Sequence, residues 1–155
     1  MPSPSSDSEQ HVSSAFLNFL RHAAAAQQNG TAQAQASWLD AAAQLHPLDD
    51  DSLDSLTTAS LAQHRHDDAI ALAAIIAQLD PNRAVAHFRL GYTLQMANRH
   101  GEAIAPYRRA LALDPRLPQL RNNLAGALML TGGDLSEQLA LLESAVQDEP
   151  GEGDA

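Results

Sequence analysis

The sequence predicts an all-α protein made of repeated pairs of helices. The chain has 155 residues, of which 45% are hydrophobic but only 4% are aromatic. Its apolar residues are chiefly Ala and Leu, which favour helices over strands. Several residues also recur every 34 positions, a length that accommodates two helices and their connections. A chain of this size is expected to form one domain with a proper hydrophobic core.

The repeat is clearest in three Leu-X-Pro tripeptides, which end at Pro47, Pro81 and Pro115. The same 34-residue interval separates the members of two further columns: Leu56, Leu90 and Leu124, and Ala42, Ile76 and Ala110. Several independent columns in one register are hard to obtain by chance. The chain is therefore expected to be a tandem array whose units stack on one another.

Each period is expected to contain two helices. Apolar residues between positions 84 and 98 form a broad amphipathic surface, and a second helix is predicted over residues 102–114. Pro115 ends this helix because proline restricts the residue before it and donates no hydrogen bond. Pro118 is expected to open the next helix, and Pro106 is expected to kink the helix that contains it.

Two further packing features are expected. Gly91 and Ala103 fall where the two helices of one pair cross, since close approach there requires small residues. The last helix, predicted over residues 135–148, has an apolar row and a polar side that suits exposure to water. The apolar row consists of Leu135, Leu139, Leu142 and Val146. We therefore expect the array to end with this helix.

Composition excludes several classes of function. Nineteen acidic residues against nine basic ones give a net charge of −10, which argues against a nucleic-acid-binding protein. The chain has no Cys and no Lys, which excludes thiol chemistry, Cys-ligated metals and Schiff-base chemistry. Seven Arg residues nevertheless lie between positions 81 and 133 with only two acidic residues. This local charge of +5 would suit an acidic segment of a partner.

No membrane insertion is expected. The longest unbroken apolar run covers residues 69–77, far short of the roughly 20 residues needed to span a bilayer. The first ten residues are polar and acidic, unlike a signal peptide. We expect a cytoplasmic protein.

No enzyme signature, cofactor motif or metal-site spacing is found in the sequence. His64 and His66 precede two acidic residues, but side chains at positions i and i+2 diverge on a helix, and this segment falls at a turn. The acidic run at residues 49–51 is expected to cap the next helix. We therefore expect a non-enzymatic protein with no catalytic residues, cofactor or metal ion.

The pattern resembles the tetratricopeptide repeat. The unit at residues 84–117 carries the resemblance through Leu90, Gly91, Leu94, Ala103, Tyr107, Ala110 and Pro115. Residues 50–83 and 118–150 resemble the family less closely, and the latter unit holds one extra residue at Gly132-Gly133. Residues 11–49 resemble a degenerate repeat or a capping helical pair. The resemblance implies an α-α superhelix of three clear repeats plus this pair, between a disordered polar tail at 1–10 and an acidic tail at 151–155.

In tetratricopeptide proteins the first helix of each repeat lines a concave groove that binds peptides. The resemblance implies that the groove residues here are Phe88, Arg89, Tyr92, Gln95, Asn122 and Asn123. Members of the family that bind chaperone tails clamp the terminal carboxylate with Lys. This chain has no Lys, so that function is not expected.

Three functions remain open at the level of sequence, and all of them require a protein or peptide partner. The chain resembles the small acidic chaperones of bacterial type III secretion in size, acidity and number of repeats. It is also similar to the interaction module at the N-terminus of a larger enzyme, such as a bacterial glycosyltransferase. The third alternative is a self-assembling scaffold, in which the chain would form a homodimer or a larger assembly.

Overall fold

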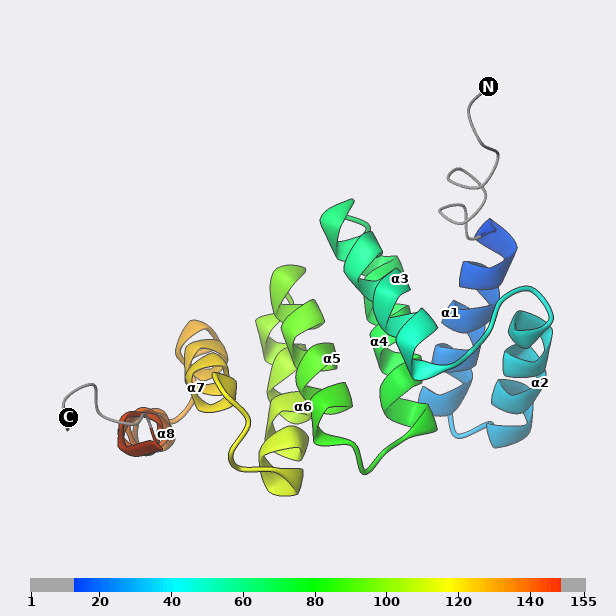
Figure 1. The fold of residues 1–155 in the computed structure, drawn as a ribbon. Helices are drawn as coiled ribbons and strands as arrows, with labels where there is room; N and C mark the ends of the chain where they lie inside the picture. Colours follow the sequence, from blue (N-terminus) through cyan, green and yellow to red (C-terminus); the bar gives the residue numbers. More distant parts are fainter. Residues whose placement is uncertain (1–12, 149–155) are drawn as a thin grey trace, which may run out of the picture. The chain divides into compact units, whose positions relative to one another are not determined.

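A computed structural model describes residues 13–148, and every regular element within them is an α-helix (Figure 1). The tails predicted at 1–10 and 151–155 lie outside the described residues. The helices are α1 (Ser14–Gln28), α2 (Ala32–Ala43), α3 (Asp50–Ala62), α4 (His66–Leu79), α5 (Ala84–Met96), α6 (His100–Leu113), α7 (Leu120–Leu130) and α8 (Leu135–Asp148). The all-α fold class is confirmed. In this part of the chain no helix is long and apolar enough to cross a membrane.

The first of two compact units ends at Ile76. In it α1 packs against α2, and α1 buries Phe16 and Leu20 completely. The buried carboxylate of Asp68 on α4 forms ion pairs with Arg21 of α1 and with Arg65. These two pairs compensate the charge of a carboxylate whose side chain is only 6% exposed.

The second compact unit begins at Ala77. In this unit α5 packs against α6, α6 against α7, and α7 against α8. Its largest fully buried side chains are Tyr107, Leu120 and Leu124. Consecutive helices therefore pack as neighbours, as the tandem pattern predicts.

The first helix of every pair ends in the same left-handed turn. The residues with positive φ at these turns are Gly30, His64, Asn98 and Gly132, each 34 positions after the one before. In each turn the next residue donates its N–H to a carbonyl five positions earlier, as in Thr31 to Ala26 and Gly133 to Leu128. This is the Schellman arrangement, which satisfies carbonyls at the end of a helix. The 34-residue interval thus extends to the turn between α1 and α2, in the part of the chain where the fewest residues match the repeat pattern.

Two expected helix boundaries are corrected by the structure. Pro118 does not open a helix but lies in a turn, and α7 begins two residues later. The reason is Gln119, whose φ of 64° is left-handed and cannot belong to a right-handed helix. α6 begins at His100, earlier than predicted, and continues through Pro106.

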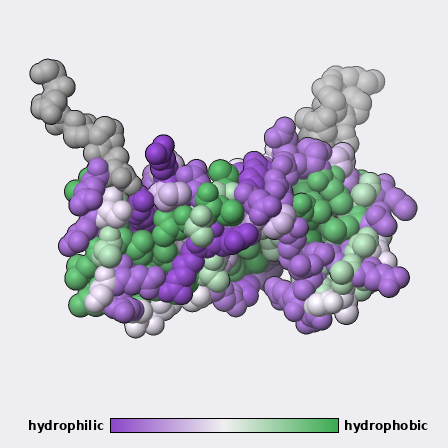
Figure 2. Space-filling view, turned by 90° about the horizontal axis from the view of Figure 1, so that it is seen from below, coloured by the Kyte–Doolittle hydropathy of each residue, from purple (hydrophilic) through white to green (hydrophobic). Residues whose placement is uncertain are grey.

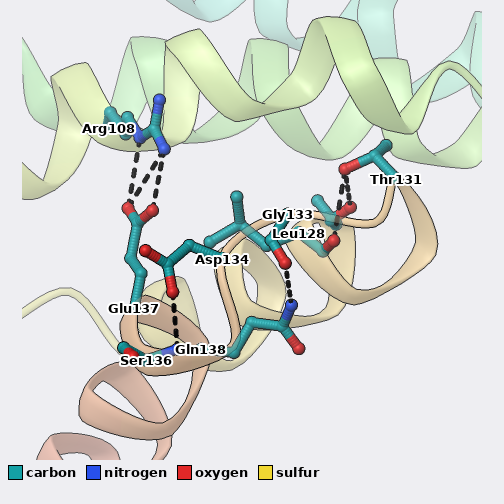
Figure 3. A network of polar contacts seen from close by, with 9 residues as sticks. Arg108, Leu128, Thr131, Gly133, Asp134, Ser136, Glu137 and Gln138 are labelled. Carbon is teal, nitrogen blue, oxygen red and sulfur yellow. Dashed lines mark hydrogen bonds and ion pairs between the residues drawn. The ribbon is translucent and has the colours of Figure 1, made fainter.

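The apolar row of α8 does not face the rest of the protein, although the sequence pattern leads one to expect this. The residues of its apolar row, Leu135, Leu139, Leu142 and Val146, are 67%, 51%, 43% and 73% exposed. Gln138, which lies to one side of this row, is buried instead, and its amide donates to the carbonyl of Gly133 at 2.9 Å (Figure 3). An amphipathic pattern shows which residues share a side of a helix, but here the neighbouring helix packs against a different side.

Candidate functional site

A surface pocket with a volume of about 350 Å³ lies beside α5. Its lining residues are Val85, Phe88, Arg89 and Tyr92 of α5, together with Gln119 just before α7. The α5 residues are three or four positions apart, so their side chains share one face of the helix. Val85 and Tyr92 are 43% and 41% exposed, whereas Phe88 and Arg89 are half-buried. Three of the six groove residues implied by the sequence therefore meet in one pocket.

The fully buried ring of Tyr107 on α6 supports the pocket from behind. The Phe88 ring lies 5.9 Å from the Tyr107 ring between centroids, at an angle of 43°. A Cβ atom at Gly91 would lie 2.6 Å from two carbon atoms of the Tyr107 ring. Gly91 is therefore needed for the close approach of this ring. The nearest neighbour of Gly91 is thus Tyr107, where the sequence suggested Ala103.

The hydroxyl of Tyr107 links three helices. It donates to Oε1 of Gln95 on α5 at 2.6 Å, and it also hydrogen-bonds with the side chain of Asn123 on α7. Burial raises the pKa of Tyr107, and the hydrogen bond from Asn123 opposes this only in part. The hydroxyl therefore keeps its proton, which the bond to Gln95 requires.

The remaining predicted residues are placed differently. Gln95 and Asn123 meet at the Tyr107 hydroxyl, so their polar groups serve the packing of α5, α6 and α7. Asn122 is exposed on α7 and does not line the pocket. That any of these residues binds a peptide stays a prediction.

Sequence reasoning missed Val85 and Gln119 as lining residues. A signal for Val85 was present, since it lies three or four positions before Phe88 and Arg89 on an amphipathic surface. Gln119 lines the pocket and has a left-handed backbone, and no residue type in this segment indicates that conformation.

The Arg-rich segment is partly neutralised in the structure. Arg108 of α6 makes a forked ion pair with Glu137 of α8, with nitrogen–oxygen distances from 2.9 to 3.3 Å (Figure 3). Arg99 pairs with Glu102 at the start of α6. The local charge of +5 was counted over positions 81–133, and this range does not include Glu137. The count therefore overstates the positive charge around Arg108.

Polar groups elsewhere have structural roles. The carboxylate of Asp49 accepts the N–H of Ser52 at 2.9 Å, which caps α3 and lowers the pKa of Asp49. The predicted capping role of this acidic run is therefore confirmed. Among residues 13–148, no group of three or more His, Cys, Asp or Glu side chains is arranged to hold a metal ion.

Solved structures of MamA, a protein with the tetratricopeptide-repeat fold, are similar to this chain. A structure of MamA AMB-1 matches with a TM-score of 0.61 and 23% identity, covering 88% of this chain and 73% of that one. A structure of MamA MSR-1 gives 0.59 and 22%, covering 84% and 75%. A further crystal structure of MamA gives 0.62 and 17%, covering 86% and 78%. These matches establish the fold, and neither a family model nor a curated protein matches the chain.

Proposed function

We propose that this chain is a non-enzymatic protein-binding protein that holds a partner peptide against α5. The observation that carries the proposal is the pocket itself, in which an exposed aromatic side chain, an apolar wall and an arginine share one face of α5. Tyr and Arg, with Trp, are the residue types enriched among the few residues that dominate the binding energy of protein interfaces. The packing of Tyr107 against Gly91 and Phe88 gives this face a rigid support.

The chemistry of the pocket indicates which peptide it would accept. A volume of about 350 Å³ is at the small end for ligand pockets, and it suits a short stretch of peptide that carries an apolar side chain. The ring of Tyr92 would pack on that side chain while its hydroxyl meets a peptide carbonyl. The guanidinium of Arg89 would bind a carboxylate. The proposed motif is therefore an apolar residue close to an acidic one.

In finer terms, the partner we propose is a secreted translocator protein that the chain holds in the cytoplasm before type III secretion. The support is the resemblance in size, acidity and repeat number. Genes for a secretion apparatus and a membrane-active substrate beside the coding gene would agree with this role. A neighbourhood without them would count against it.

The binding proposal is tested with peptides selected from a random display library on the immobilised full chain. Isothermal titration of a selected peptide should show that Tyr92→Ala and Arg89→Glu each weaken binding by about 1–3 kcal/mol. Tyr92→Phe should lose only the part due to the hydroxyl. Melting followed by circular dichroism establishes that each variant remains folded.

The matched control is Arg109→Glu on α6, which makes the same change of charge at an exposed position. Arg108 is unsuitable because it binds Glu137. Equal losses for Arg109→Glu and Arg89→Glu would reveal a nonspecific charge effect, and full binding by Tyr92→Ala would move the site away from this pocket.

A further inference from the structure

The most exposed apolar surface of the second unit belongs to α8. Its row of Leu135, Leu139, Leu142 and Val146 is 43–73% exposed, and it runs along the whole helix. Figure 2 shows green apolar surface along its left-hand edge, where α8 lies. A continuous apolar row of this kind on a surface helix marks an interaction site.

The spacing within this row is that of a coiled-coil seam. Its members are separated by four, three and four residues, which gives consecutive d, a, d and a positions of a heptad. A helix with such a seam packs most favourably against another helix with a matching seam. Two heptads form a short interface, so the association is expected to be weak and dependent on concentration.

The seam is complementary to itself when two copies run antiparallel. Leu135 then faces Val146 of the second copy, and Leu139 faces Leu142, so that each a position meets a d position. A two-fold axis that crosses the pair of helices at the middle of the row gives the same pairing. In such an isologous interface every contact between two residues occurs twice. We propose that two copies of this chain associate through α8, with the two helices antiparallel across a two-fold axis.

The charges beside the row agree with a second copy as the occupant. Glu143 flanks the seam on the same side as Ser136, and in the antiparallel arrangement the nearest residue of the second copy on that side is Ser136, so like charges do not face each other. Glu137 points to another side, where it is bound by Arg108. The sequence at 149–155, Glu-Pro-Gly-Glu-Gly-Asp-Ala, offers no large apolar side chain with which to cover the row.

Sedimentation equilibrium of the full chain over a range of concentrations tests the interface. The chain should shift from monomer to dimer as its concentration rises. Leu139→Glu should weaken dimerisation at least tenfold, because it places a charge in the seam. Ala140→Glu, with the same charge one residue away and outside the row, should behave as the unchanged chain. A monomer at every concentration, or a dimer unaffected by Leu139→Glu, would overturn the proposal.

Single cysteines test the orientation, since the chain has none of its own. Under oxidation, a mixture of Leu135→Cys and Val146→Cys chains should form a mixed disulfide. Leu135→Cys alone should not dimerise covalently, because the two copies of position 135 lie about 16 Å apart along the antiparallel pair. Rapid disulfide formation by Leu135→Cys alone would overturn the antiparallel arrangement.

Discussion

At the scale of single residues, Gly91 controls how the pocket is built. Its missing side chain admits the buried ring of Tyr107, which an added Cβ would meet at 2.6 Å. We expect Gly91→Ala to lower the free energy of unfolding by about 1–3 kcal/mol, because the ring has no room to move away. Denaturant unfolding of the full chain measures this change.

Gly126→Ala is the matched control for this substitution. Gly126 also lies inside a helix, α7, but nothing lies within 4 Å of a Cβ added there. Since Ala favours helices over Gly by about 0.5–1 kcal/mol, Gly126→Ala should stabilise the chain. Similar effects of the two variants would show that Gly91 does not face the Tyr107 ring.

The residues of the site could be predicted only in part. Phe88, Arg89 and Tyr92 were implied by the resemblance to the tetratricopeptide repeat, and their spacing places them on one face of α5, which is a local property. The partners of Gln95 and Asn123 do not follow, since both depend on where α6 places the Tyr107 hydroxyl. Contacts between helices are set by packing geometry that no local pattern records.

At the scale of elements, the recurring left-handed turn gives a test of the repeat. His64 occupies a conformation that Gly30 and Gly132 adopt without steric cost. His64→Gly should therefore raise the free energy of unfolding, and Gly132→Ala should lower it, each by about 1 kcal/mol. Thermal and denaturant unfolding measure both changes.

Gly101→Ala serves as the comparison, because Gly101 lies in α6 and an added Cβ there meets only one atom, at 3.8 Å. It should not destabilise the chain. If Gly132→Ala were equally harmless, the left-handed turn would not be a strict requirement of the repeat.

The helices themselves were largely predictable, because the 34-residue period and the prolines mark their ends. The start of α7 was not, since Gln119 adopts a left-handed conformation that is unusual for its residue type. The exposed side of α8 was not predictable either. Residues on either side of α8 recur at helical spacing, so the sequence pattern does not show which side is buried. The packing of α8 against its neighbouring helix decides this.

At the scale of the whole molecule, the chain forms two compact units, and we expect the first to contain its least stable helix. The only Trp, Trp38, lies in α2, where its ring stacks on His22 at 4.6 Å and lies 5.7 Å from the ring of Phe19. α2 fully buries only Ala42, so it is held by little apolar area. We expect the fluorescence of Trp38 to change at a lower temperature than the loss of helical circular dichroism. Coincident transitions would instead show one cooperative unit.

Binding at the α5 pocket is the central claim, and photo-crosslinking tests it most directly. A benzophenone amino acid replaces Tyr92 in one full-length chain and Arg109 in another, and each is irradiated with the library-selected peptide. We expect a covalent adduct from position 92 and little or none from position 109. Adducts of equal yield from both positions, or an adduct from position 109 alone, would contradict binding at this pocket.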